Sequence, residues 1–446
     1  TSPARQPKPP VEPFTREHML ADLVMVRDPA TGKFKTSPLF ERIVSRDARG
    51  YEFVRTSVVP DDDPLRRRAE ELGMTSMLHP DDEHAAAQAP SPASVLESRA
   101  LGCMYGLVCG DALGSRLEFQ PLRYDKELVL ENMGEGPAGK FELQPGQGTD
   151  DTAMAMCLAD SLLCCGKWDP ADCMHRYLAW YYGGLNNGFR YDTSKDPPRT
   201  SVGLGGCIRR AMARFVNEQP DYTTIGDETT NGNGSLMRLA PVPIAYHDDL
   251  ACAMEVAQLQ SRVTHRGTQA AECCRLVAAI ICHALNRSDS TADAKTVLRE
   301  ATATFTSPCA SVMALAQSRA QKKRHTTKPT ADAAACAEEE DEDEGEDIDP
   351  DRDWRWAADT YRFSPKRATD QPGYVGSYVM DAAAMALHCV WATTSVRDAI
   401  LKAANQCGDA DTVAAIAGQI AGAIYGLESI PHDWLAAVCR WDHCDN

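Results

Sequence analysis

Residues 146–152 read GQGTDDT and lead directly into the apolar run AMAMCLA at residues 153–159. A second stretch of the same kind, CGDADT at residues 407–412, leads into VAAIAG at residues 413–418. Asp and Thr at a helix start commonly cap free backbone N–H groups. One cap needs one such residue, yet each stretch carries two carboxylates. Crowded carboxylates repel one another unless a cation lies between them, so the two stretches are candidates either for plain helix caps or for a site that holds Mg²⁺ or Mn²⁺.

The chain around these two stretches has helical periodicity almost throughout. Apolar and small residues recur at helical spacing from residue 93 onward, and runs that resemble strands are scarce. We therefore predict an all-α fold, a compact multi-helix domain with a mixed N-terminal extension. The predicted helices cover residues 93–109, 152–165, 169–182, 202–216, 250–261, 268–285, 292–305, 379–393, 395–404 and 412–425.

Two parts of the chain depart from this helical pattern. Residues 1–95 form a Pro-rich, mixed extension and linker of unknown function, in which residues 51–59 alternate like a strand and residues 63–72 resemble a short charged helix. The helical domain then covers residues 96–446. Within it, residues from about 307 to 353 are predicted to be a disordered acidic insertion, because residues 338–353 hold twelve acids and one arginine.

Composition limits the classes of function. The 446-residue chain has a net charge of −18, which disfavours nucleic-acid binding, because phosphate contacts need clustered Lys and Arg. No apolar run approaches the ~20 residues of a membrane span, so we expect no membrane association. The 17 cysteines include no CxxC pair, which indicates free thiols in a reducing compartment. We expect an intracellular, cytoplasmic protein that is a monomer.

Further motifs occur between and beside the two stretches. The segment GDALG (residues 110–114) is followed by Glu118, and GNGSLMR (residues 232–238) forms a Gly/Asn turn. Thr264-His265 precedes an apolar helix, and glycines recur every four residues at 418, 422 and 426. In this order the motifs resemble the ADP-ribosylglycohydrolase family, whose founding bacterial member reactivates dinitrogenase reductase. Each alone has an ordinary structural explanation; together they are specific.

The resemblance implies a binuclear metal cleft with two Mg²⁺ or Mn²⁺ ions. Glu118 would lie on a mobile loop over this cleft and would act with Asp150 and Asp151 in catalysis. The turn Asn233-Gly234-Ser235 would hold the diphosphate, and His265 would line the ADP-ribose pocket. The metal ligands implied by the resemblance are Thr149, Asp150, Asp151, Asp409, Asp411 and Thr412.

The sequence departs from the family pattern at three positions. Cys407 stands where a glycine is usual, Ala410 where Ser or Thr often separates the aspartates, and Gly148 where an aromatic residue often precedes the TDD run. The expected metal ligands remain, so the resemblance implies metal binding, whereas substrate contacts made by an aromatic residue at position 148 are in doubt.

The implied activity is hydrolysis at ribose C1 that removes ADP-ribose from a modified protein side chain, with arginine as the first expectation and serine as the second. The partner would be an ADP-ribosylated protein or a small molecule that contains ADP-ribose. Two alternatives stay open at this point. One is a non-catalytic ADP-ribose binder or structural relative, and the other is a two-metal phosphoesterase.

Overall fold

The computed structural model describes residues 25–27, 34–36, 92–120, 130–183, 186–188, 201–218, 220–224, 226, 230–288, 293–319, 354–359, 361 and 376–439. Within these ranges the elements of regular secondary structure are helices, apart from one short antiparallel pair of strands, β1 (Met25–Arg27) and β2 (Phe34–Thr36). The all-α prediction is therefore confirmed for the helical domain. The strand expected at residues 51–59 and the helix expected at residues 63–72 lie outside the described ranges.

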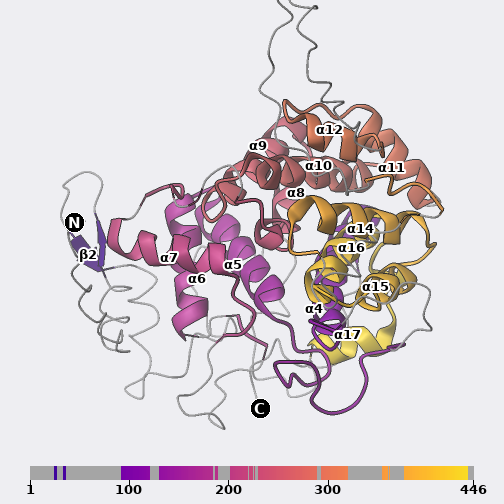
Figure 1. Cartoon of the computed structure of the whole chain (residues 1–446), viewed down its shortest axis with the longest axis horizontal. Coiled ribbons are helices and arrows are strands. Elements are labelled where there is room, and N and C mark those ends of the chain that lie inside the picture. The colour runs from indigo at the N-terminus through magenta and orange to yellow at the C-terminus, as the bar shows by residue number, and fades with distance from the viewer. Residues whose placement is uncertain are drawn as a thin grey trace, which may run out of the picture.

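The helices gather into a single body around a shared apolar core (Figure 1). The predicted helices are all present, and their ends shift by a few residues only. The helices are α4 (Val95–Gly114), α5 (Asp150–Cys165), α6 (Pro170–Gly183), α7 (Gly206–Glu218), α8 (Pro241–Ala245), α9 (Leu250–Arg262), α10 (Thr268–Leu285), α11 (Ala294–Ala303), α12 (Ala310–Ala316), α14 (Val379–Trp391), α15 (Val396–Ala404), α16 (Ala410–Tyr425) and α17 (His432–Cys439), with 3₁₀ turns η4 (Asn233–Ser235) and η5 (Leu427–Ser429).

Helices α4 and α16 make the most extensive contact of any two helices that the structure describes. Glycines repeat every four residues along one face of α4, at 102, 106, 110 and 114, and face Gly422, Gly418, Ala414 and Ala410 of α16. A Cβ added at any of the four α4 glycines would lie 2.2–2.5 Å from a carbonyl oxygen of α16. The two backbones are thus in direct contact, which explains the glycine stripe noted on α16.

The structure corrects the predicted start of the acidic insertion. Residues 310–316 form α12, which packs into the core through Val312 and Leu315, both fully buried. The expectation of disorder from residue 307 is therefore wrong up to residue 319. A seven-residue apolar run is too short to be a stable helix by itself, but burial against neighbouring helices stabilises it here. Residues 320–353 lie outside the described ranges.

Helix α10 packs against several other helices, chiefly α9, α11 and α16. It is the one helix, within the part of the chain described, whose length and apolar composition would suffice to cross a membrane, but 83% of it is buried inside the protein. It therefore serves as a core helix here. None of the fourteen cysteines whose side chains the structure describes forms a disulfide, and most of them are buried.

Candidate metal centre

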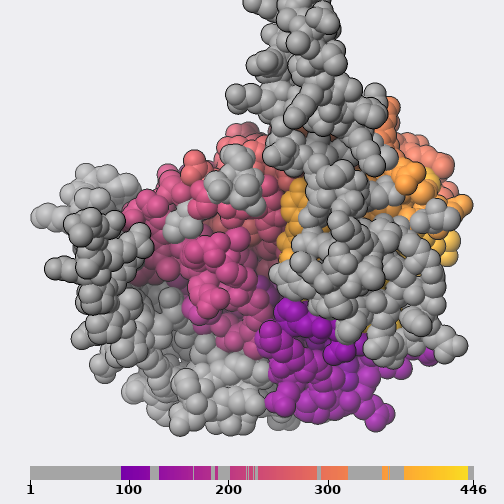
Figure 2. Space-filling view, in the orientation of Figure 1, coloured from indigo at the N-terminus to yellow at the C-terminus, as the bar shows by residue number. Residues whose placement is uncertain are grey.

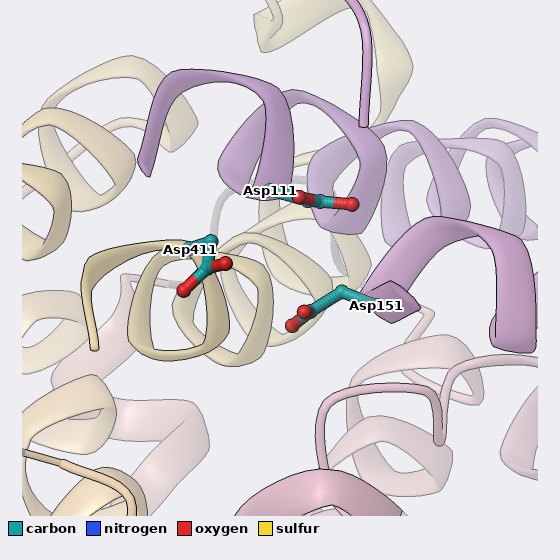
Figure 3. Close-up of side chains that lie close together, drawn as sticks. All are labelled: Asp111, Asp151 and Asp411. Atoms are coloured by element: carbon teal, nitrogen blue, oxygen red, sulfur yellow. The ribbon is translucent and has the colours of Figure 1, made fainter. Parts of the chain in front are cut away.

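Three helices each bring one aspartate to the same point. Asp111 lies in the last turn of α4, Asp151 in the first turn of α5 and Asp411 in the first turn of α16. All three are buried, and one carboxylate oxygen from each lies within 4.8 Å of the others. Figure 3 shows the three side chains approaching from their separate helices. The two stretches singled out in the sequence therefore meet, and α4 adds a third side to the site.

A second group of carboxylates adjoins the first. Oxygens of Glu118, Asp409 and Asp411 also lie within 4.8 Å of one another. Glu118 stands in the turn that follows α4, and Asp409 directly precedes α16. Asp411 belongs to both groups, so one carboxylate is shared between two adjacent sets of oxygen ligands. Adjacent sets of carboxylate oxygens are the kind of ligand that hard divalent cations prefer.

The residues at the two helix starts do not act as ordinary caps. Thr149 and Asp409 occupy the N-cap positions of α5 and α16, but neither side chain makes a capping hydrogen bond. Thr149 instead directs its hydroxyl to the Asp111 carboxylate at 2.9 Å. Thr412 is buried beside Asp411, whose carboxylate accepts the Thr412 backbone N–H at 2.9 Å. The surplus oxygens of both stretches are thus used at the shared site.

Asp111 is a site residue that the sequence prediction omitted. It is fully buried, and its carboxylate accepts four hydrogen bonds, from the backbone N–H and the hydroxyl of both Thr149 and Thr152, at 2.5–2.9 Å. These bonds fix its position at the start of α5. The signal available in the sequence was an aspartate within GDALG, one position after a glycine of the α4 face, which a helical projection places beside the partner helix.

Two glycines allow backbone to approach these carboxylates closely. A Cβ at Gly148 would lie 2.7 Å from Asp111 Oδ2 and 2.6 Å from the Thr152 hydroxyl. A Cβ at Gly203, in the segment before α7, would lie 2.0 Å from Asp150 Oδ1. The absence of an aromatic residue at position 148 is therefore explained sterically, because a side chain there would displace Asp111 and Thr152.

Burial raises the pKa of every carboxyl group in the site, and for four of the six the charges of neighbouring carboxylates add to the effect. For Glu118 the pKa rises to about 9, first because of burial and then because of the charges of Asp409 and Asp150, while Lys140 opposes the change. Burial and the Asp111 charge raise the pKa of Asp150 to about 8. Burial, followed by neighbouring carboxylates, raises the pKa of Asp151 and Asp411 well above the ordinary range. Burial also raises the pKa of the Asp111 and Asp409 carboxyls.

The chemistry of these residues fits hard divalent cations. Glu118 Oε2 and Asp151 Oδ1 are buried oxygens without a hydrogen-bond partner. Buried carboxylates without compensation are costly, and none of the site carboxylates forms an ion pair within the described residues. Carboxylate and hydroxyl oxygens are the ligands that Mg²⁺ and Mn²⁺ prefer. The buried acidic cluster is therefore consistent with a metal site.

Asn233 in η4 supports Asp409. Its side-chain N–H group donates to Asp409 Oδ2 at 2.8 Å and to the Gly376 carbonyl at 2.6 Å. The neighbouring Ser235 is fully buried, and its hydroxyl is hydrogen-bonded to Ser261 at 2.7 Å. The diphosphate role predicted for this turn stays a prediction, and for Ser235 it would involve the backbone rather than the hydroxyl.

His265 lies beneath the same turn. It is buried, its Nδ1 atom is 2.9 Å from the Thr264 hydroxyl, and its ring would be 3.2 Å from a Cβ at either Gly232 or Gly234. Burial and then the Arg238 charge lower the pKa of His265 to about 3, so its imidazole is neutral. The structure gives it the position of a support for the η4 turn, and its predicted contact with ADP-ribose stays a prediction.

The last residue of the GNGSLMR segment, Arg238, supports the turn from within the core. It is fully buried and donates to the Gln260 side chain, the Gln260 carbonyl and the Thr264 hydroxyl, while its guanidinium lies 4.7 Å from the Tyr177 ring centre. It therefore holds the loop that carries His265 under η4. Its role is structural support of the turn beside the carboxylates.

Backbone hydrogen bonds connect the segments that carry Glu118 and Asp409, and each segment contains one residue with positive φ. Phe119 (φ 63°) and Cys407 (φ 66°) adopt the left-handed conformation, which is costly for residues other than glycine. Phe119 N–H donates to the Gly408 carbonyl at 2.6 Å, and Gly408 N–H donates to the Gln120 carbonyl at 2.9 Å. The backbone at Cys407 thus has the conformation that glycine adopts at no cost, which accounts for the usual glycine at this position.

Comparison with known proteins agrees with this geometry. The family model described as ADP-ribosylglycohydrolase matches residues 92–446 of the chain, which includes every carboxylate of the site. The chain belongs to the ADP-ribosylglycohydrolase family. It is accordingly an ADP-ribosyl hydrolase by family, which disfavours the two-metal phosphoesterase considered from the sequence.

Individual relatives cover most of the helical domain. The ADP-ribosylarginine hydrolase Tri1 of Pseudomonas putida (strain GB-1) is 33% identical, over 77% of this chain and 75% of that protein. The ADP-ribosyl-dinitrogen reductase glycohydrolase of Rhodospirillum rubrum is 26% identical, over 77% of this chain and 91% of that protein. A solved structure of an ADP-ribosylglycohydrolase-related protein complex is similar with a TM-score of 0.53 and 27% identity, over 78% of this chain and 97% of that chain.

Proposed function

We propose that this ADP-ribosylglycohydrolase removes ADP-ribose from arginine side chains of modified proteins, by hydrolysing the bond between ribose C1″ and a guanidinium nitrogen. Relatives named ADP-ribosylarginine hydrolase are 33% and 29% identical to this chain, which supports arginine ahead of serine. The observation that carries the proposal is the convergence of six carboxylates from three helices and two adjoining turns: Asp111, Glu118, Asp150, Asp151, Asp409 and Asp411.

Two Mg²⁺ or Mn²⁺ ions are the cofactors that suit this donor set. Asp111 and Asp151 would hold one ion, Glu118 and Asp409 the other, and Asp411 both. The Thr149 hydroxyl, which is hydrogen-bonded to Asp111, and the buried Thr412 would supply further oxygen ligands. When bound, the ions supply positive charge that orients the ribose hydroxyls and lowers the pKa of a water molecule.

Glu118 is the group best placed to move a proton. Its Oε2 atom has no hydrogen-bond partner, and it stands in the turn beyond the end of α4 rather than within a helix. Glu118 accepts the proton of the water whose oxygen bonds to C1″, and it returns that proton to the departing arginine nitrogen as the C1″–N bond breaks. Asp150 and Asp151 are the alternative acceptors of this proton, and their carboxylates interact electrostatically with Glu118.

The remaining contacts hold these groups in place and suit the diphosphate. Four hydrogen bonds fix the Asp111 carboxylate, and Asn233 fixes that of Asp409. Gly203 and the turn at residues 232–234 flank the carboxylates, since Gly203 adjoins Asp150 and Asn233 binds Asp409. Backbone N–H groups that glycines leave uncovered can donate to phosphate oxygens at close range.

The proposal is tested with two peptides of matched sequence, one ADP-ribosylated on arginine and one on serine. Release of ADP-ribose is measured with Mg²⁺, with Mn²⁺ and with EDTA. We expect turnover of the arginine-linked peptide that EDTA abolishes and that Asp409→Asn lowers at least about 100-fold. Preferred turnover of the serine-linked peptide would refute the arginine assignment. Full activity in EDTA, or in Asp150→Asn and Asp409→Asn, would refute the metal-dependent mechanism.

A further inference from the structure

Phe119 presents an exposed aromatic ring beside the catalytic carboxylates. It follows Glu118 directly, its side chain is 38% exposed, and its backbone is held at φ 63°. A large aromatic residue rarely adopts this conformation, and residues that do are concentrated at functional sites. Two backbone hydrogen bonds between residues 119–120 and Gly408 maintain it. The conformation keeps the Glu118 carboxylate in the buried cluster while the next side chain reaches the surface.

The face of this ring already accepts a cation. Lys140 Nζ lies 4.0 Å from the centre of the Phe119 ring. The charge of the same lysine also acts on Glu118, so a cation over this ring lies within electrostatic reach of the acidic cluster. Lys140 is exposed, and Figure 2 shows the purple segment that leads into α5 at the molecular surface. A flexible, hydrated lysine in this position can leave the ring without disturbing the core.

The geometry points to Phe119 as a specificity-determining residue: we propose that its ring is the platform for the guanidinium of ADP-ribosylated arginine, and that Lys140 covers the platform until substrate displaces it. A guanidinium is planar and stacks on aromatic faces more readily than an ammonium group does. The modified guanidinium must lie beside ribose C1″, and Phe119 directly follows Glu118, the proposed acid–base group at that bond. Serine-linked substrate offers no cation to this ring.

This inference rests on the proposed arginine activity, so the experiment separates the two. The Michaelis constant of an arginine-linked ADP-ribosyl peptide is compared with the inhibition constant of free ADP-ribose, which lacks the guanidinium. We expect Phe119→Leu to raise the ratio of these two constants about tenfold, equivalent to about 1.4 kcal/mol, as expected for a cation–π contact. Phe119→Trp should keep the ratio near that of the wild type, because it retains an aromatic face.

A second variant distinguishes the ring from the backbone. Phe119→Asn removes the ring but suits the left-handed conformation, so the same rise in the ratio as in Phe119→Leu assigns the effect to the ring. Lys140→Met should lower the Michaelis constant of the arginine-linked peptide, because the competing cation is gone. Equal shifts of the Michaelis and inhibition constants, or no shift in Phe119→Leu, would overturn the platform. Absence of wild-type turnover would instead refute the proposed function.

Discussion

Gly106 of α4 and Gly418 of α16 are in backbone contact: a Cβ at Gly106 would lie 2.2 Å from the Gly418 carbonyl oxygen, and a Cβ at Gly418 would lie 2.0 Å from that of Gly106. The contact repeats along both helices, and it ends where Gly114 meets Ala410. At that end the last turn of α4 carries Asp111 and the first turn of α16 carries Asp411. The close approach of two backbones therefore sets the separation of two carboxylates in the site.

Adding a methyl group at this contact should destabilise the protein. Gly106→Ala places a side-chain atom where only a backbone shift can make room, so we expect the free energy of unfolding to fall by about 1–3 kcal/mol, even though alanine favours the helix. Urea unfolding measures this change. Gly206→Ala is the matched control, because this exposed first residue of α7 has only the Arg210 side chain nearby, at 3.4 Å from the added atom. Equal stability of Gly106→Ala and the wild type would contradict the contact.

Removing the shared carboxylate should have opposite effects on stability and on metal binding. Burial, followed by the charges of four other carboxylates, raises the pKa of Asp411, so folding without metal must keep this acid protonated at a cost. Asp411→Asn removes that cost and should stabilise the chelated protein by about 1 kcal/mol. The same change should weaken Mn²⁺ binding at least about 100-fold by titration calorimetry. Asp398→Asn, at an exposed position on α15, serves as the control: it should leave Mn²⁺ binding unchanged and lower the stability by at most about 0.5 kcal/mol, through loss of a surface ion pair and a helix-dipole contact. Unchanged Mn²⁺ affinity in Asp411→Asn would exclude it as a ligand.

The stability of the chelated protein should fall as pH rises. Burial raises the pKa of Glu118 from 4.5 to about 9 and that of Asp150 from 3.8 to about 8. Above about pH 4 the unfolded chain releases these protons while the folded chain retains them, so the folded state binds more protons and its stability declines with pH until these pKa values are passed. Urea midpoints in EDTA should therefore be lower at pH 8 than at pH 5.5.

Divalent cations should reverse this trend, because they bind the ionised carboxylates, so the folded state no longer binds more protons than the unfolded state. With saturating Mn²⁺ the urea midpoint at pH 8 should equal or exceed that at pH 5.5. Midpoints in EDTA that rise between pH 5.5 and 8 would show that the carboxylates are already ionised and compensated within the protein.

Gly203 should be needed for the position of Asp150. The added Cβ of Gly203→Ala would lie 2.0 Å from Asp150 Oδ1, and the backbone at φ 91° disfavours any side chain. We expect the turnover of ADP-ribosylated arginine peptide to fall about 10- to 100-fold. Gly205→Ala is the matched control two residues away, where nothing lies within 4 Å of the added atom. Comparable losses in both variants would indicate a general effect on this segment rather than a contact with Asp150.

The sequence was sufficient to predict the helices and the two carboxylate-bearing helix starts, residues 149–152 and 409–412, that contribute to the site. Surplus carboxylates at two helix starts are a local signal, and so is the recurrence of glycines every four residues in α16. The partner, α4, was not predicted, because which two helices meet depends on the folded core rather than on either helix alone. Asp111 was omitted for the same reason: its neighbours Thr149 and Thr152 belong to another helix start.

The turn at residues 233–235 shows a further limit of sequence patterns. Its letters suggested a phosphate loop, but the Ser235 hydroxyl is hydrogen-bonded inside the core and Asn233 binds Asp409. A sequence motif indicates which residues belong to a site, but it does not show which of their atoms face the ligand. The fate of a short apolar run such as α12 is likewise decided by the neighbours that bury it, here Trp356, whose indole N–H donates to the Leu315 carbonyl at 2.7 Å.

The central claim is that α4, α5 and α16 assemble two adjacent cation sites, and anomalous diffraction from crystals grown with Mn²⁺ tests it most directly. The account predicts two anomalous peaks, one within reach of Asp111, Asp151 and Asp411 and one within reach of Glu118, Asp409 and Asp411. Absence of both peaks, or Mn²⁺ bound only at carboxylates outside this cluster, would contradict it.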